Sequence, residues 1–372
     1  MTYGLYIHIP FCIKKCAYCD FVSACAPEAQ QRAYFAALKQ ELKSCKGKQL
    51  DSIFLGGGTP SCVDARLIAA LFDSINENMT VLPGAEITLE ANPGTLTAEK
   101  LRIYRDCGIN RISLGVQSLQ ERELRALGRI HSAQEAVHAA NLVQAAGFNN
   151  LNLDLMLAVP YQTRDSLRDT LVRAAALSPT HISAYSLIVE PGTPFYTQQQ
   201  AGTLPLPDED LERALCDDAA AFLEAHGYAQ YEISNYAKPG FACRHNLKYW
   251  LCQPYLGIGA AAHGYDGVAR YENVSVVGDY IWLMNKRGSA CKEKTELTKQ
   301  DQISEYIIMT LRLTRGIVLD EFAARFGFRF EKAYENTIHK FTNGGFFQIE
   351  TDRICFTQKG FAVSNAILSE FV

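Results

Sequence analysis

The first half of the chain alternates short apolar runs with longer amphipathic segments. In the longer segments, apolar residues recur at helical spacing, for example in residues 28–44 and 132–147. Six runs have the length and residue types of buried strands, namely residues 3–9, 52–56, 86–92, 111–117, 150–157 and 181–189. Six strand–helix units in succession predict an α/β fold with a parallel sheet and helical crossovers. A complete eight-unit barrel needs about 250 residues, and the alternation fades near residue 190, so we expect a partial (β/α)6 TIM-like barrel.

The rest of the chain has a different pattern. One long helix is predicted at residues 207–227, and the charge-free stretch from Tyr249 to Tyr265 is expected to form a loop because it contains a proline and several glycines. Three helical patterns and a hairpin-like pattern then follow at residues 300–313, 319–327, 330–345 and 346–357. This order predicts a C-terminal α+β domain of winged-helix type. We therefore expect three regions, which are a core barrel at 1–235, a connecting segment at 236–290 and a C-terminal domain at 291–372.

The charges argue against a nucleic-acid partner. A winged helix that binds DNA needs a basic surface, but residues 296–372 contain nine Lys and Arg against ten Asp and Glu. The whole chain has 36 basic and 40 acidic residues. We therefore expect the C-terminal domain to act as a scaffold or docking domain. No basic residue precedes Lys14 and no apolar run approaches the ~18–20 residues of a spanning helix, so a cytoplasmic location is expected.

Three of the twelve cysteines form a compact group. Cys12, Cys16 and Cys19 have the spacing C-x3-C-x2-C, whereas the other nine are scattered singly. A zinc site commonly uses four ligands in two CxxC pairs, and only one such pair is present. Thiolates also hold [4Fe–4S] clusters, and three cysteines would leave one iron open to an exchangeable ligand. The alternatives are three buried or redox-passive cysteines, or a zinc site with Cys25 as a fourth ligand.

This cysteine loop, which follows the first predicted strand and is followed by the aromatic Phe21, resembles the cluster-binding loop of the radical S-adenosylmethionine (SAM) family. The resemblance implies that SAM binds the open iron through its amino and carboxylate groups and that a reduced cluster cleaves it to a 5′-deoxyadenosyl radical. The cofactor then supplies the chemistry and the protein supplies the orientation.

The predicted barrel contains further residues that agree with this resemblance. LGGGTPS at residues 55–61 looks like the family's motif for the SAM amino group, and polar residues recur at the predicted strand ends, where a barrel site is assembled. Singly, each polar residue is more often a satisfied hydrogen-bonding group than a ligand. The resemblance assigns the following residues to SAM or to the surroundings of the cluster: Tyr6, Tyr18, Gly57, Gly58, Thr59, Glu90, Gln117, Arg129 and Asp154.

Within the family, the chain is similar to the HemN-like branch, which includes the oxygen-independent coproporphyrinogen III dehydrogenases. Those enzymes carry a fourth cysteine two residues after the third, where this chain has Phe21, and a substantial segment before the cluster loop, where this chain has eleven residues before Cys12. In both features the chain resembles the HemW family of haem chaperones instead. Ala158, Tyr161 and Ala261 stand where glycine is usual in the branch, which leaves the local loop geometry open.

The segment CRHNLKYW at residues 243–250 resembles the HNxxYW motif of the HemW family, a candidate haem site. An imidazole can be an axial iron ligand, and aromatic side chains offer flat apolar area to a porphyrin. Without the resemblance, such a histidine would more often be structural. The candidate haem residues are His245, Asn246, Tyr249 and Trp250, with Cys243 and His263 as weaker candidate ligands.

We therefore expect a haem chaperone with a [4Fe–4S] cluster and a SAM site that transfers haem to an acceptor such as a respiratory protein. The alternatives are a coproporphyrinogen III dehydrogenase and another HemN-like radical enzyme, so the sequence leaves open whether SAM is cleaved or only bound. No residue is assigned a catalytic role. The resemblance also implies a reductant for the cluster, a homodimer and peripheral membrane contact.

Overall fold

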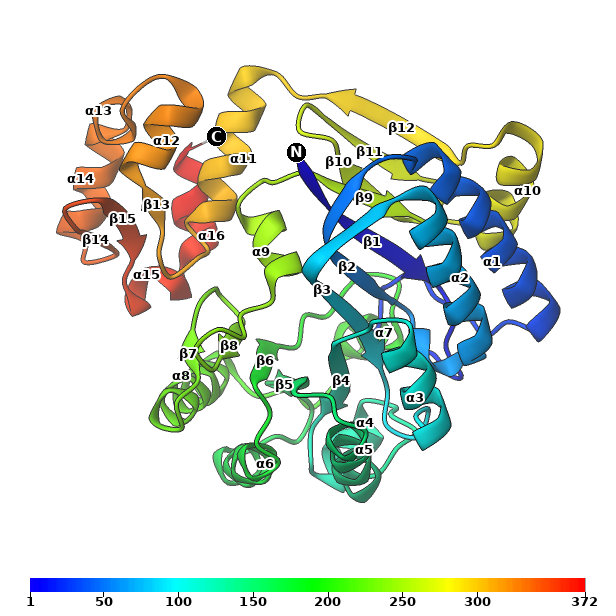
Figure 1. Ribbon diagram of the computed structural model, residues 1–372. Helices are drawn as coiled ribbons and strands as arrows, with labels where there is room; N and C mark the ends of the chain where they lie inside the picture. The colour runs from blue at the N-terminus through cyan, green and yellow to red at the C-terminus, as the bar shows by residue number, and fades with distance from the viewer. Residues whose placement is uncertain (372) are drawn as a thin grey trace.

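A computed structural model, which describes residues 1–371, confirms the partial six-unit barrel (Figure 1). Its strands pair in parallel in the order of the sequence and are β1 (Thr2–Ile9), β2 (Gln49–Gly57), β3 (Thr80–Ala91), β4 (Arg111–Gln117), β5 (Asn150–Leu157) and β6 (His181–Ser186). One row of fully buried apolar side chains crosses the sheet at Ile7, Leu55, Leu89, Ile112 and Leu151. The apolar runs in the sequence are therefore strands because each buries such residues in the shared core.

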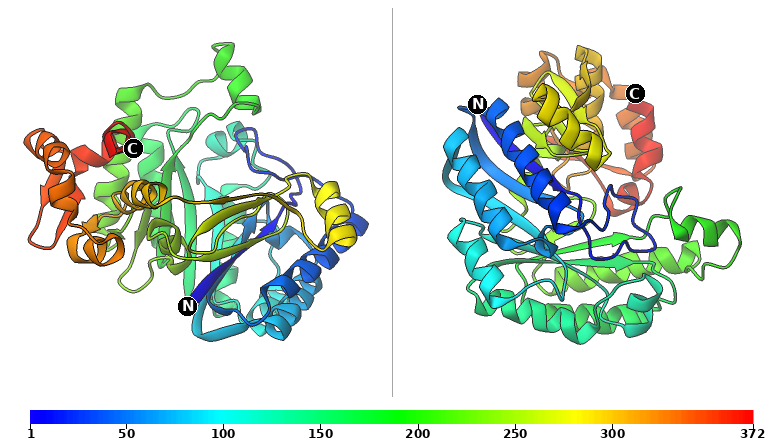
Figure 2. Two further views of the ribbon diagram at one scale, coloured as in Figure 1. Left: turned by 90° about the horizontal axis from the view of Figure 1, so that it is seen from above. Right: turned by 90° about the vertical axis from the view of Figure 1, so that its right-hand side faces the viewer.

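Helices cover the outer face of these strands (Figure 2). They are α1 (Glu28–Leu42), α2 (Ala65–Asn78), α3 (Ala98–Asp106), α4 (Glu121–Ala126), α5 (Ala133–Ala145), α6 (Arg164–Ala176) and α8 (Glu209–Ala225). A further helix, α7 (Pro194–Gln200), lies beside the cysteine loop instead, where the Phe195 amide donates to the Ala17 carbonyl at 3.1 Å. Several begin at a side-chain cap, as at Ser132, whose hydroxyl oxygen accepts from the Glu135 amide. The long predicted helix at 207–227 is α8, which begins after its capping residue Asp208.

The sheet extends beyond the barrel at both edges, to twelve strands. Beyond β6 lie β8 (Asn235–Ala237) and β7 (Ala229–Gln230), and beyond β1 lie β9 (Tyr255–Ile258), β10 (His263–Tyr265), β11 (Ala269–Asn273) and β12 (Cys291–Glu296). The expectation of a loop from Tyr249 to Tyr265 is therefore wrong, because β9 pairs in parallel with β1 and supports β10. The strands within residues 255–296 join one sheet, although the sequence predicted a boundary between two regions at residue 290. The boundaries of the three regions remain predictions.

Helix α9 (Arg244–Trp250) carries the CRHNLKYW segment, and α10 (Val277–Arg287) joins β11 to β12. The three non-glycine positions of doubtful geometry adopt left-handed backbone, with φ of 54° at Ala158, 68° at Tyr161 and 58° at Ala261. This region favours glycine. The loops thus keep a conformation suited to glycine although other residues occupy them.

The C-terminal domain has the helix, helix, helix and hairpin order of a winged helix, with a core of its own. Its elements are α11 (Lys299–Thr310), β13 (Ile317–Val318), α12 (Leu319–Phe326), α13 (Phe330–Ala333), α14 (Glu335–Asn343), β14 (Phe347–Ile349), β15 (Arg353–Phe356), α15 (Gln358–Ala362) and α16 (Ser364–Leu368). It lies against α9 and the β6 side of the barrel (Figure 1). Within residues 1–371, no helix combines the length and the apolar character that crossing a bilayer requires.

Candidate functional site

The cysteine loop lies at the carboxyl end of the barrel strands, where barrel sites are assembled. It follows β1 and is held at both sides, because the Cys12 amide donates to the Ala24 carbonyl at 3.1 Å and the Ala17 amide donates to the Leu127 carbonyl at 3.2 Å. The thiols of Cys12, Cys16 and Cys19 line one cavity of about 410 Å³. We call it the cluster cavity.

Cys25 differs from these three cysteines. Its side chain is exposed, and its Sγ donates to the Ile13 carbonyl at 3.0 Å. It lies outside the set of residues that line the cluster cavity. Three of the thiols therefore share one cavity, and the Cys25 thiol lies outside it.

The glycines after β2 bring that strand end close to the loop. A Cβ at Gly58 would lie 2.7 Å from the Phe11 carbonyl oxygen, and Gly57 has a φ of 109°. Only residues without a side chain fit there. Thr59 completes the wall: its Oγ1 lies 3.5 Å from the Cys12 Sγ and accepts from the side-chain nitrogen of Asn92 at 2.8 Å.

Arg129 also lines the cluster cavity, and Asn92 connects it to Thr59. Its guanidinium donates to the Cys16 Sγ at 3.4 Å, to the Asn92 side-chain oxygen at 2.6 Å and to the Gly115 carbonyl at 2.7 Å. Its Nε is buried without a partner among the described residues. A buried cation with an unused donor fits an anionic group such as a carboxylate.

Glu90 and Asp154 are buried carboxyls at the wall of this cavity. Burial and, next, the charge of Asp154 raise the pKa of Glu90 to about 8. Burial also raises the pKa of Asp154, although Ser113 and Asn152 donate hydrogen bonds to it at 3.1 and 2.8 Å. Glu90 accepts from the Gly57 amide at 3.1 Å. Two buried acids with few donors suit a ligand that brings cationic or hydroxyl groups.

Gln117 and Tyr18 complete the predicted set in the cluster cavity. Gln117 ends β4 with a left-handed φ of 67°, and its side-chain oxygen accepts from the Tyr185 hydroxyl at 3.2 Å. Left-handed backbone at a non-glycine residue recurs at functional sites. Asn92, Ser113 and Tyr185 line the same cavity and were not predicted from the sequence. Asn92 could have been found, since it stands two residues after Glu90 at the end of the same strand.

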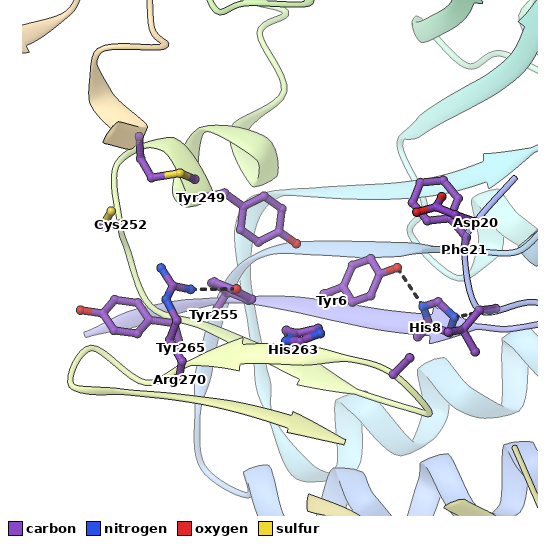
Figure 3. A pocket seen from close by; sticks show the side chains of 13 residues that line it. Tyr6, His8, Asp20, Phe21, Tyr249, Cys252, Tyr255, His263, Tyr265 and Arg270 are labelled. Atoms are coloured by element: carbon purple, nitrogen blue, oxygen red, sulfur yellow. Dashed lines mark hydrogen bonds between the residues drawn. The ribbon is translucent and has the colours of Figure 1, made fainter. Parts of the chain in front are cut away.

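Tyr6 lies elsewhere, in a second cavity of about 540 Å³ (Figure 3). Its hydroxyl hydrogen-bonds to the His8 Nδ1 at 3.1 Å. We call this space the aromatic cavity; it is lined by Tyr6, His8, Asp20, Phe21, Val22, Tyr249, Cys252, Tyr255, Ala261, His263, Tyr265, Arg270 and Met309. Asp20 and Phe21 line both cavities, so the two spaces are neighbours.

The candidate haem residues divide between this cavity and the core. Tyr249 points into the aromatic cavity, whereas the His245 ring is fully buried behind it. Both ring nitrogens of His245 are engaged, one with the Ser52 hydroxyl at 2.9 Å and the other with the Tyr249 hydroxyl at 2.8 Å. Burial lowers the pKa of His245 to about 3, so the ring is neutral. In this arrangement His245 holds Tyr249 and presents no free nitrogen to a ligand.

The other candidates are placed as follows. Asn246 and Trp250 are half-buried on α9, outside the sets of residues that line the two cavities. Cys243 is buried, and its Sγ donates to Glu86 at 3.3 Å. His263 is exposed and lines the aromatic cavity.

Comparison with known proteins finds a matching family for each of the two main parts of the chain. The family described as "Radical SAM superfamily" matches residues 6–174, and the "HemN C-terminal domain" matches residues 297–363. Among solved structures, the coproporphyrinogen III oxidase HemN from Escherichia coli superposes with a TM-score of 0.87 over 100% of this chain and 90% of that one, at 24% identity. At that identity the likeness shows the fold alone.

Curated relatives match most or nearly all of the chain. "Heme chaperone HemW" of Bacillus subtilis is 36% identical over 99% of this chain and 98% of that protein. The protein of the same name from Haemophilus influenzae is 37% identical over 99% and 97%, and that from Escherichia coli is 43% identical over 70% and 69%. The chain therefore belongs to the HemW family within the radical SAM superfamily.

Proposed function

We propose that this protein binds haem and transfers it to an acceptor protein. The observation that carries the proposal is the similarity along 99% of the chain to proteins named heme chaperones. A second observation supports it: a large cavity with aromatic walls lies beside the cluster cavity, and flat apolar walls suit a porphyrin. Phe21 contributes an apolar ring to the wall that both cavities share. A haem-accepting protein and a reductant for the cluster are the partners that this function needs.

Membership of the radical SAM superfamily implies a [4Fe–4S] cluster and SAM. We propose that Cys12, Cys16 and Cys19 hold the cluster and leave one iron open. The donor set fits, because three thiols face one cavity, and the Arg129 guanidinium, which contacts the Cys16 thiol, has an unused donor there. When bound, such a cluster supplies one-electron chemistry to SAM.

The residues around the cluster cavity would bind and orient SAM. Arg129 offers its Nε to the carboxylate, and the backbone at Gly57 and Gly58 allows close approach of the amino group. Glu90 and Asp154 accept hydrogen bonds from amino or ribose groups, and at neutral pH the raised pKa keeps a proton on much of Glu90. Thr59, Gln117 and Tyr18 line the remaining wall.

A haemin titration of the purified protein tests the haem function. Absorption should show saturable binding near one haem per chain, and bound haem should pass to a haem-free acceptor protein. Absence of specific binding, together with SAM-dependent decarboxylation of coproporphyrinogen III, would instead support the dehydrogenase.

Substitution of single cysteines tests the cluster ligands. After anaerobic reconstitution we expect wild type to show the broad visible absorption of a [4Fe–4S] cluster and an electron spin signal on reduction. Serine at Cys12, Cys16 or Cys19 should abolish both signals, because each replaces one of three thiolate ligands. Cys25→Ser is the matched control and should keep them; loss there as well would contradict a three-cysteine site.

A further inference from the structure

The aromatic cavity has the walls of a porphyrin site and lies between three segments that are distant in sequence. Tyr6 comes from β1, Tyr249 from α9, and Tyr255 from β9. Figure 3 shows these rings around one space, with Arg270 and Tyr265 at one end and Asp20 and Phe21 at the other. Its volume of about 540 Å³ lies within the usual range for cavities that bind ligands of this size.

We propose that the aromatic cavity holds the haem macrocycle and that His263, not His245, ligates the iron. This inference rests on the proposed haem function and assigns its site. The histidines near the cavity differ in the state of their ring nitrogens, and only a nitrogen with a free lone pair can bind iron.

His8 and His245 are both occupied. The nitrogens of His8 contact the Tyr6 hydroxyl at 3.1 Å and the Val22 carbonyl at 2.8 Å. Those of His245 contact the hydroxyls of Ser52 and Tyr249. Each ring is also buried, so neither can turn toward a ligand without breaking two hydrogen bonds in the core.

His263 is free to bind. It lies on β10 at the wall of the cavity, and its side chain is 66% exposed. Its one close polar neighbour among the described residues is the Glu272 carboxylate, 3.7 Å from Nε2. A carboxylate beside a ligating histidine orients the ring and raises its basicity. Nε2 has Glu272 as its neighbour, so Nδ1 is the nitrogen that would be left to bind iron.

The HNxxYW segment, in which His245 is buried, supports the wall of the aromatic cavity opposite His263. The hydroxyl of Tyr249 is held by His245, and the His245 ring stacks on Phe54 with centroids 5.4 Å apart. Phe54 in turn stacks on Tyr6 at 6.2 Å. A continuous set of rings therefore runs from the HNxxYW segment to the cavity, which fixes the flat surface that a macrocycle would contact.

The charges at the two ends of the cavity give an orientation. At the end formed by Tyr265 and Cys252, Arg270 forms an ion pair with Glu305 at 2.6–3.0 Å. Asp20 is an acid at the other end, next to the cluster cavity. Haem carries two anionic propionates on one edge. Because Asp20 would repel a propionate, the propionate edge should face the end with the Arg270–Glu305 pair, and the apolar edge should face Phe21 and the cluster cavity.

The test is a titration of the full-length protein with haemin and, separately, with metal-free protoporphyrin IX. His263→Ala should bind haemin about tenfold more weakly or worse and should change the absorption of the bound haem, because the iron loses its imidazole. Protoporphyrin IX has no iron, so its affinity should be the same for wild type and His263→Ala. The matched control is His339→Ala, which removes another histidine that is 66% exposed and near a glutamate, at 3.9 Å, in the C-terminal domain.

Two results would overturn the assignment of His263 as the iron ligand. Both can be distinguished from a failure of haem binding itself. Haemin binding and spectrum unchanged in His263→Ala would show that another group ligates the iron. A spectrum changed in folded His245→Gln but unchanged in His263→Ala would move the ligand to the motif. If wild type bound neither haemin nor protoporphyrin IX, the haem function itself would fail, and this site with it.

Discussion

Glu90 shows how burial sets the protonation of a single residue in the cluster cavity. Its pKa rises from 4.5 to about 8 on folding, through burial and then Asp154. Between these values the folded chain binds more protons than the unfolded chain, so the free energy of unfolding falls as pH rises, by up to about 1.4 kcal/mol per pH unit for one group. We predict that Glu90→Gln removes this contribution, which urea denaturation of cluster-free protein at a series of pH values would measure.

The control for this prediction is Glu232→Gln. Glu232 is also buried, and burial raises its pKa to about 7, but it lies in the turn between β7 and β8. Both variants should therefore flatten the loss of stability with pH, while only Glu90→Gln should lower the affinity for SAM. An unchanged slope in Glu90→Gln would contradict the raised pKa, and an unchanged SAM affinity would contradict its place in the site.

At the scale of elements, the sequence predicted those with regular periodicity and missed those that depend on tertiary pairing. The six barrel strands are long apolar runs, so their pattern identifies them. Strands β9 and β10 have four and three residues, which is too short for a period to be read. They form because β1 offers a free edge, to which residues 255–258 pair.

The two cavities also differ in how far the sequence predicts them. The residues of the cluster cavity stand in motifs at strand ends, so a barrel prediction already brings them together. The aromatic cavity joins Tyr6, Tyr249 and His263, which no local pattern connects. The burial of His245 depends on Ser52, 193 positions earlier in the chain. A histidine motif in sequence therefore cannot reveal whether its ring nitrogens are free.

At the scale of the whole molecule, the C-terminal domain completes the aromatic cavity. Met309 from α11 and Cys252 from the turn after α9 both line it. Two of the contacts that hold the domain there involve arginines. Arg270 on β11 forms a bidentate ion pair with Glu305 at 2.6–3.0 Å, and Arg325 on α12 donates to the carbonyls of Leu251 and Cys252 at 3.1 Å each. Movement of this domain would therefore open the cavity.

Arg325 gives the sharpest test of that coupling, because its two donors meet carbonyls at the carboxyl end of α9, where a cation also complements the helix dipole. Arg325→Ala should lower the free energy of unfolding by about 1 kcal/mol, a modest value because the side chain is exposed, and should speed dissociation of bound haem in stopped-flow transfer to an acceptor. Arg329→Ala is the control, since Arg329 pairs only with Asp320 and Glu331 of its own domain among the described residues. Equal haem dissociation rates in the two variants would mean that the C-terminal domain does not gate the cavity.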